Sequence, residues 1–383
     1  MARIRLTSFQ DLIEHLADYE GGSTGDDTIR YCRRAVQDAY NHFSTLHNWS
    51  YLYSRMRVTT VAAVTAGTIA YTNSTLTVVL TGATWPSWVT QGVLVINNIP
   101  YAIASNPTST TITLPPQNNP GADVASSPYT LYQDAYNLPI DFVSCDEIMN
   151  INYGLRLTYE HAATWLTMQR IYRGPATPRI YSITGSPGFF GAMSLRFFPP
   201  PDNIYFMDAI YKRRMRPLST ILVNAGTAST TSGSTTVTGA GTNWDSTMVG
   251  ASFRISIQGS NVTPTGPSGE NPFYIERTIL AVASPTSLTV DADPVYTASN
   301  LSYAISDPVD MEEGAMLNFM LRLCEKQVRI SRRIKSTPEE IADYQASKME
   351  AMEADNRSTM RQAVGSGGYP RRLRDFPSGP DQG

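Results

Sequence analysis

Two Thr-rich segments of this chain follow the same order of short motifs. One contains TGATWPSWVTQGVLVI at residues 81–96, and the other contains TGAGTNWDSTMVGASFRI at residues 238–255. Each begins at an Ala-Gly-Thr, continues through a Pro-Thr-Ser turn and a Thr-flanked strand, and ends in a tyrosine-bearing strand. Because order, spacing and length agree, we expect an internal repeat of two small β-sandwich or β-barrel domains, at residues 57–135 and 218–306.

Each copy sets a tryptophan among small and polar residues, with a glycine soon after it. Trp85 with Gly92, and Trp244 with Gly250, are the expected anchor positions of the two copies. We expect these two rings and that of Trp88 to pack inside their own β domains, because large aromatic side chains dominate small cores. The alternative is a sugar-stacking role, which needs an exposed ring. Trp88 has no counterpart in the second copy and is the better candidate for an exposed contact.

Composition places the chain among globular proteins, since 42% of its 383 residues are hydrophobic and only 16% are charged. A formal net charge of −3 argues against a strongly basic nucleic-acid footprint. Cys32, Cys145 and Cys324 lie far apart, which favours buried hydrophobes over a disulfide framework or zinc site. Polar residues interrupt the N-terminal apolar positions, and no run of about 18 apolar residues occurs. We therefore expect no signal peptide, no membrane span and folding in a reducing cytoplasm.

Helical periodicity near the N-terminus predicts two helices. Thr7 and Gln10 fit a capping box ahead of the first, and residues 29–43 place apolar side chains on one face of the second. One further helix is expected in the middle of the chain, at residues 160–172.

Two more helices are expected near the C-terminus. Asp307 fits the N-cap of the first, with Pro308 at its first helical position. Thr337 fits the N-cap of the second, with Glu340 closing a capping box.

The rest of the chain reads as a single interrupted body made of residues 1–56, 136–217 and 307–383. Strands are expected in its middle piece at PRIYSI, MSLRFF and NIYFMDAIYKRRM. The last of these alternates two sets of side chains: Tyr205, Met207, Ala209 and Tyr211 against Ile204, Phe206, Asp208 and Ile210. The predicted fold class is therefore α+β, a helical bundle with a small β portion as the body, plus two inserted all-β domains.

A search for catalytic or metal-binding patterns finds none with a specific spacing. His42 and His47 are five residues apart, off a common helix face, and the other histidines are His15 and His161. Asp141, Asp146 and Glu147 cluster in LPIDFVSCDE, where turn and cap roles are the simpler interpretation. A glycosidase pair stays open, because two carboxylates leave almost no sequence signature.

The C-terminal segment follows a Gly-rich linker at residues 365–368 and mixes cations with apolar side chains. Such side chains make interface anchors, and a tail of this kind can order only on a partner. The candidate binding residues are Tyr369, Arg371, Arg372, Leu373, Arg374 and Phe376.

The order of motifs outside the repeats resembles a known family. A helical pair ending in FSTLHNWSYLY is followed by YNLPIDFVSCDEI, then GPATPRIYSITG, then MSLRFFPPPDNIYFMDAIYKRRMRPLS, then two helices. This resembles bacteriophage head–tail connector (adaptor) proteins, the tail tubular protein A type of short-tailed phages. In that family Y-x-LP-x-DF starts the β portion after the helical hairpin, and F-x-P-x-PD … Y precedes a PLS-like return to the helices. The resemblance covers residues 1–56, 136–220 and 307–383, and the β repeats look like inserted immunoglobulin-like domains.

The resemblance implies a structural virion protein at the head–tail junction, assembled in the bacterial cytoplasm, with no enzymatic activity, cofactor or metal. It implies a dodecameric ring that joins the portal to the tail and lets DNA pass during ejection. The implied partners are the portal protein, a tail tube or nozzle protein, tail fibres through the β domains, and other copies of the chain. Heterologous contacts can close such a ring, and a slightly acidic chain suits a lumen that DNA passes without sequence-specific binding. In such adaptors the C-terminal segment reaches the portal.

Two other classes of function stay open. A carbohydrate-binding adhesin, a tail-fibre-type attachment protein, would suit the Thr-rich β repeats and their tryptophans. A polysaccharide-degrading enzyme would need a carboxylate pair that the sequence does not mark.

Overall fold

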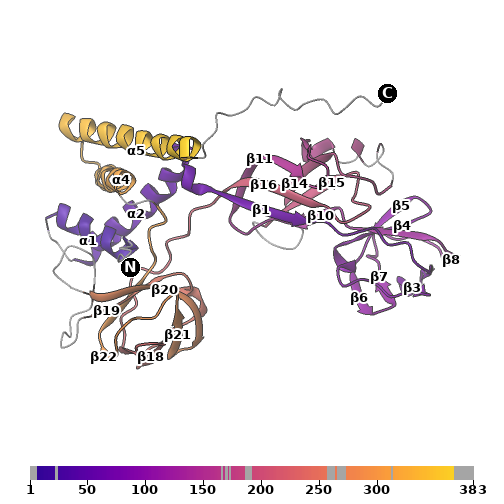
Figure 1. The fold of residues 1–383 in the computed structure, drawn as a ribbon, viewed down its shortest axis with the longest axis horizontal. Coiled ribbons are helices and arrows are strands. Elements are labelled where there is room, and N and C mark those ends of the chain that lie inside the picture. Colours follow the sequence, from indigo (N-terminus) through magenta and orange to yellow (C-terminus); the bar gives the residue numbers. More distant parts are fainter. Residues whose placement is uncertain are drawn as a thin grey trace. The chain divides into compact units, whose positions relative to one another are not determined.

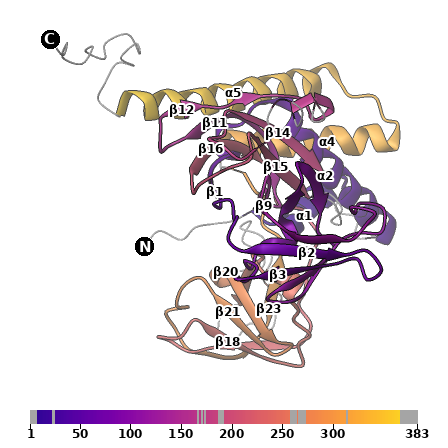
Figure 2. The same ribbon diagram turned by 90° about the vertical axis from the view of Figure 1, so that its right-hand side faces the viewer.

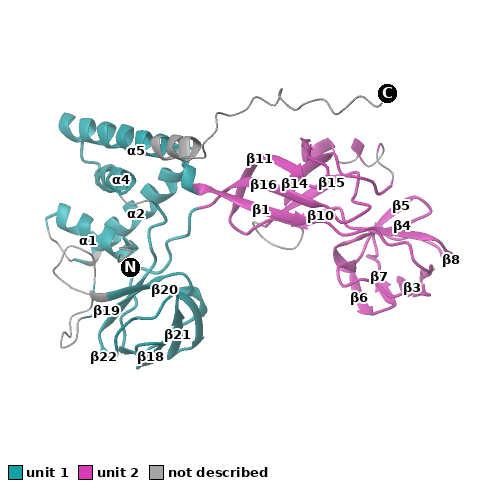
Figure 3. Cartoon of the chain, viewed as in Figure 1, with its two compact units in different colours: residues 1–51, 215–383 teal, residues 52–214 magenta. Residues whose placement is uncertain are grey.

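The computed structural model describes residues 7–21, 25–164, 167–168, 171, 174–185, 192–256, 264, 273–311 and 314–365. They form two compact units, residues 1–51 with 215–383, and residues 52–214 (Figure 3). The chain is mostly β, with 37% strand against 26% helix. The prediction of a helical-bundle body with a small β portion is therefore wrong. It weighted the long helical patterns at the chain ends, whereas many strands of only two to six residues fill the middle.

The first unit contains the four named helices of the described residues: α1 (Phe9–Tyr19), α2 (Asp26–Leu46), α4 (Ala315–Arg332) and α5 (Pro338–Gly365) (Figure 1). Both α2 and α5 pack against α4. Trp49 is fully buried among them, where its ring stacks on Phe43 at 4.5 Å and its Nε1 donates to the Phe43 carbonyl. Phe319 of α4 contacts both rings and also Tyr344 of α5. Trp49 of the FSTLHNWSYLY motif therefore belongs to the core of the helices. None of the described helices is long and apolar enough to span a membrane.

Helix starts follow capping chemistry, with two differences from the expected residues. The capping box of α1 uses Ser8 and Asp11, one residue later than expected at each position. The box of α5 is confirmed: the Thr337 backbone N–H donates to Glu340 at 2.8 Å, and the Glu340 N–H donates to Thr337 Oγ1 at 3.3 Å.

The expected N-cap role of Asp307 is wrong. Helix α4 begins at Ala315 after Gly314, whose φ of 97° only glycine adopts readily. Asp307 still binds backbone N–H groups, but those of residues distant in sequence.

The first unit also contains a β domain (Figure 2). Its strands are β17 (Thr227–Thr230), β18 (Thr236–Ala240), β19 (Ser252–Ser256), β20 (Phe273–Ser284), β21 (Ser287–Val290), β22 (Ala298–Leu301) and β23 (Tyr303–Ser306), with the 3-10 turn η4 (Ser246–Met248). They pair in the order β22-β17-β18-β21-β20-β19-β23. The long strand β20 pairs with β19 through its first half and with β21 through its second half.

The second unit contains a β domain of the same design. Its strands are β2 (Thr68–Thr72), β3 (Thr77–Thr81), β4 (Val93–Ile96), β5 (Ile99–Ala102), β6 (Ser105–Thr108), β7 (Thr111–Thr113), β8 (Val124–Ser127) and β9 (Tyr129–Tyr132), with η2 (Val89–Gln91). The sheet orders are β6-β7-β3-β2-β8 and β5-β4-β9. The two domains have the same strand order if β20 is taken as the equivalent of β5 and β6 together. The order β22-β17-β18-β21-β20 then corresponds to β8-β2-β3-β7-β6, and β20-β19-β23 corresponds to β5-β4-β9.

The shared motifs have a shared physical reason. The Tyr129 hydroxyl donates to the Ala66 carbonyl at 2.8 Å, and the Tyr303 hydroxyl donates to the Ala225 carbonyl at 2.7 Å. The glycine that follows each alanine has φ near +85° (87° and 84°), and a Cβ there would collide with a carbonyl oxygen of the paired strand. Each Ala-Gly-Thr is therefore tied to the tyrosine of its last strand.

The remaining strands of the second unit form the body sheets. They are β1 (Tyr53–Thr59), β10 (Ala135–Asn137), β11 (Phe142–Asn150), β12 (Leu155–Arg156), β13 (Thr158–Tyr159), β14 (Ile180–Gly185), β15 (Met193–Phe198) and β16 (Phe206–Arg213), with the 3-10 turns η1 (Ser50–Leu52), which precedes β1, and η3 (Ala162–Thr164). One sheet has the order β1-β16-β11-β12 and the other β10-β15-β14-β13. Both contribute to one core, which includes Met56, Ile148, Met207, Tyr136, Tyr181 and Phe197. Much of the helix expected at residues 160–172 lies outside the described residues.

Candidate functional site

The two tryptophans among the predicted β-repeat anchors lie in the two β-domain cores. Trp85 is buried and meets Tyr129 edge-on at 5.4 Å, while Trp244 is 2% exposed and meets Tyr303 edge-on at 5.6 Å. Trp88 is partly buried and packs against the first of these cores. Sugar stacking needs an open ring, which neither Trp85 nor Trp244 offers.

The two anchor glycines differ in environment. A Cβ at Gly92 would approach the Leu131 side chain to 2.9 Å, so any larger residue there would require that side chain to shift. Gly250 has a φ of 81°, and a Cβ there would collide with the Arg216 guanidinium. By strand register Gly92 is equivalent to Ala251, because each donates its N–H to the residue three before it, ahead of β4 and β19.

The predicted portal-binding residues cannot be described in the same way. Tyr369, Arg371, Arg372, Leu373, Arg374 and Phe376 lie outside the described residues.

The candidate carboxylates of LPIDFVSCDE have different surroundings, and Asp141 and Glu147 bind different partners. Asp141 accepts a hydrogen bond from the Tyr211 hydroxyl at 3.1 Å, and Glu147 pairs with Arg156 at 3.4 Å. Asp146 is exposed next to a bulge in β11. In the described part of the chain, no three His, Cys, Asp or Glu side chains gather where they could hold a metal ion.

The cysteines are free thiols. Burial raises the pKa of the Cys145 thiol to about 11, and burial also raises the pKa of Cys32 and Cys324. At neutral pH these groups are protonated, and a thiol is a poor nucleophile and metal ligand.

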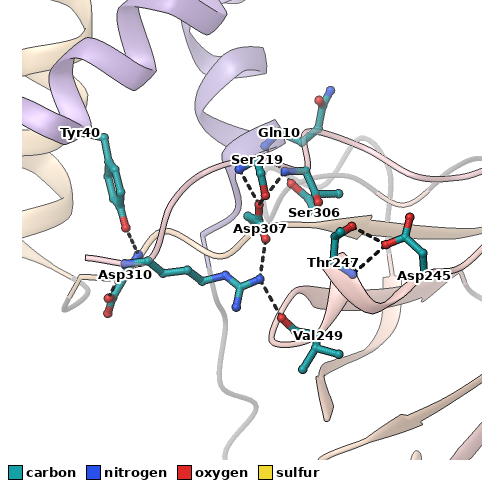
Figure 4. Close-up of polar contacts among 11 residues, drawn as sticks. Gln10, Tyr40, Ser219, Asp245, Thr247, Val249, Ser306, Asp307 and Asp310 are labelled. Carbon is teal, nitrogen blue, oxygen red and sulfur yellow. Dashed lines mark hydrogen bonds and ion pairs between the residues drawn. The ribbon is translucent and has the colours of Figure 1, made fainter. Parts of the chain in front are cut away.

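Asp307 is a buried polar hub where the chain leaves β23. Its carboxylate accepts from the Ser219 N–H at 2.7 Å, the Ser219 hydroxyl at 3.0 Å and the Thr220 N–H at 2.6 Å (Figure 4). Arg216 donates to Asp307 at 2.8 Å and to the Val249 carbonyl at 3.0 Å. The network ties residues 216–220, which contain the PLS motif, to the end of β23. The role of Asp307 is therefore structural.

A second buried charge cluster ties α1 to the same β domain. Arg254 of β19 donates to both carboxylate oxygens of Asp11, at 2.9 and 2.8 Å, and to Glu276 of β20 at 2.9 Å. All three side chains are almost inaccessible to solvent. Breaking one member of such a cluster leaves a buried charge without its partner, so the cluster fixes the helix on the domain.

The β1-β16-β11-β12 sheet has an outer face with many exposed apolar side chains. Its inner face lies in the body core, whereas its outer face exposes apolar side chains. Ile210 is 62% exposed, and Phe206, Met149 and Tyr53 are each more than a third exposed. Apolar positions on both faces of a strand are typical of a sheet covered on both sides. The outer face is therefore the candidate functional site, an interaction surface.

Charged side chains lie among these apolar ones. Asp208 of β16 accepts from Arg57 at 2.6 and 2.9 Å and also pairs with Arg55, both on the neighbouring strand β1. The hydrogen bond from Arg57 holds the pKa of Asp208 well below its usual range, with Arg55 acting in the same direction. The strand register adds Lys212, Glu147 and Arg156 to the same face, which thus carries four basic and two acidic groups.

The sequence analysis did not identify this face, although a signal was present. It described the Tyr205–Tyr211 set of β16 and the opposite set only as the alternation of a strand, without assigning either set to a buried face. The opposite set contains Ile204, Phe206 and Ile210, which is more apolar than a solvated face requires.

Comparison with known proteins adds no relative. No protein-family model matches the chain, and no curated protein matches it.

Proposed function

We propose that the chain is a ring-forming head–tail adaptor of a tailed bacteriophage. In this role it joins the portal of the head to the tail, and DNA passes through its lumen during ejection. It works in the virion as a structural protein, with the portal, a tail tube or nozzle protein and other copies of itself as partners.

The observation that carries the proposal is that the residues behind the family resemblance are used together. Tyr136, Leu138 and Phe142 of YNLPIDF share one core with Phe197 and Tyr205 of the F-x-P-x-PD segment. The Tyr205 hydroxyl also donates to Asp202 at 2.6 Å, within that motif. Motifs that are weak alone are thus parts of one packing unit, which supports the proposal.

The PLS-type return supports the same conclusion. Ser219 of this return donates twice to Asp307, the residue that precedes the C-terminal helices. The segment that enters the β domain at Ser219 and the segment that leaves it at Asp307 are therefore joined by direct hydrogen bonds.

The adhesin hypothesis depends on tryptophans that are open to solvent. Trp85 and Trp244 are core residues and Trp88 packs partly buried against the first core, so the tryptophans of the described residues do not favour that hypothesis over the adaptor.

The test is binding to the portal protein of the phage that encodes the chain. Purified chain and purified portal rings would be sedimented separately and together through a density gradient. The proposal predicts that the chain moves to the portal fractions at a fixed molar ratio. A chain that stays at the top of the gradient at every ratio would refute it.

A further inference from the structure

The outer side of α5 is an acidic stripe. At 100° per residue, Glu339, Asp343, Glu350 and Glu353 fall on one side of the helix, and all four are exposed. Ala342, Ala346 and Met349 lie between them, also exposed. The side opposite holds the buried residues Tyr344, Ala351 and Asp355. We call the first seven residues the acidic stripe.

The acidic stripe has the chemistry of a docking face. Small side chains at Ala342 and Ala346 let another backbone approach closely, and Met349 is 63% exposed. Between residues 338 and 356 the chain has one basic residue, Lys348, which falls on the side of the helix opposite to the stripe.

The outer face of the β1-β16-β11-β12 sheet is complementary in charge and in spacing. The register aligns Arg57, Asp208, Met149 and Arg156 in one row across the four strands. Three strand steps place the two arginines about 14 Å apart at the backbone. The eleven helical steps from Glu339 to Glu350 span about 16.5 Å along the helix. Two carboxylates of the stripe are therefore spaced to meet two arginines of the sheet.

Covering a sheet with a helix is also the usual way to bury an apolar sheet face. The stripe offers Met349 and two alanines, and the sheet offers Ile210, Phe206 and Met149. The contact would thus bury apolar area in its centre and leave ion pairs around it, as stable interfaces do.

We propose that the acidic stripe of α5 docks on the outer face of the β1-β16-β11-β12 sheet of a second copy of this chain. The two surfaces are different patches, so the contact is heterologous, and repetition of one heterologous contact can close a ring. This inference rests on the proposed adaptor function and names the contact that builds its ring.

The test uses two charge-reversal variants. In the sheet variant, Arg55→Glu with Arg156→Glu makes the face two basic and four acidic groups, and it leaves the Arg57–Asp208 pair in place. In the helix variant, Glu339→Lys with Glu350→Lys reverses half of the carboxylates of the stripe. Sedimentation velocity over a concentration series at low and high salt gives the masses. Circular dichroism and thermal unfolding check that each variant folds.

Wild-type chain should assemble, and each variant alone should lose about tenfold or more in association constant, because like charges then face each other. An equimolar mixture of the two variants should recover assembly. In that mixture the unchanged acidic stripe of the sheet variant meets the unchanged basic face of the helix variant, and the two new lysines of the helix variant meet the acidic face of the sheet variant. The recovered particles should therefore contain both variants in equal numbers. A control with Arg34→Glu and Arg179→Glu changes the net charge equally, away from both surfaces, and should assemble as wild type does.

Three results would overturn the inference. A wild-type chain that stays monomeric throughout the series shows no such contact. A helix variant that assembles normally while the sheet variant does not shows that the sheet face pairs with itself. A mixture that fails to recover, although both variants are folded, excludes charge matching between the two surfaces. Portal sedimentation of the wild-type chain is scored separately, so the adaptor function can stand when this contact fails.

Discussion

The indole Nε1 of Trp244 donates a hydrogen bond to the hydroxyl of Tyr303 at 3.1 Å, inside the core of the β domain formed by β17–β23. The equivalent pair in the other β domain, Trp85 and Tyr129, has the same edge-on ring contact. Among the described residues, however, the Nε1 of Trp85 has no acceptor. The two copies thus share packing and differ in one hydrogen bond.

This difference predicts unequal effects of the same substitution. Trp244→Phe should lose both packing volume and a buried hydrogen bond, which is worth about 1 kcal/mol. Trp85→Phe loses volume and removes a buried donor without a partner, so its free energy of unfolding should fall less. Urea unfolding of both variants, followed by tyrosine and tryptophan fluorescence, measures the two losses. Equal losses would contradict the argument. Trp244→Ala should cost more than either, about 3–5 kcal/mol.

The Asp307 hub predicts that a single carboxylate stabilises the junction between the PLS-type return and the last β strand. Asp307→Asn keeps the size but removes the charge that four donors share, so stability should fall by about 2–4 kcal/mol. Ser219→Ala removes one side-chain donor and should cost about 1 kcal/mol. The free energies of unfolding of the two variants, measured in urea, check this order. A smaller loss in Asp307→Asn than in Ser219→Ala would show that the hub is not cooperative.

Asp208 predicts a dependence of stability on acid. Its pKa in the folded protein lies below the ordinary value because Arg57 and Arg55 bind the carboxylate. Its contribution is therefore complete above the unfolded-state pKa of about 3.9 and is lost as the pH falls below that value toward the folded-state pKa. Asp208→Asn should be less stable than wild type at neutral pH, and the difference should shrink in acid. Urea midpoints from pH 7 to pH 2 measure it, with Asp146→Asn as an exposed control that should leave the profile unchanged.

The capping chemistry and the repeat show how much the sequence alone could predict. The box at Thr337 and Glu340 depends on residues three apart, so local pattern was enough to find it. The apolar face of α2 and the strand alternation of β16 followed in the same way from periods of 3.6 and 2. Asp307 also has the acceptor role that its type suggested, but toward Ser219 and Thr220, which are distant in sequence.

The proportion of helix to strand was harder to predict, because short strands carry a weak periodic signal. Strands β7 and β10, with three residues each, also pair with β3 and β15, which lie far from them in the chain and outside any local window. The outer sheet face was missed for a similar reason. Ile210, Arg57 and Arg156 come from three strands that are far apart in the chain, and only the register puts them on one surface.

The C-terminal tail predicts a separable portal-binding element. Deleting residues 366–383 should leave thermal stability unchanged, because this segment begins in the Gly-rich linker at residues 365–368. Portal binding should weaken by at least about tenfold, since Tyr369 and Phe376 are the apolar anchors of the predicted contact. Arg371→Ala with Arg372→Ala and Arg374→Ala should give a smaller, salt-dependent loss. Equal portal affinity in the truncated and full-length chains would show that the tail does not bind the portal.

The most direct test of the adaptor function is single-particle electron microscopy of the full-length chain mixed with portal rings from the same phage. The proposal predicts a closed ring of the chain, coaxial with the portal, with an open lumen. Portal particles without added density, or with isolated copies of the chain on their sides, would contradict it.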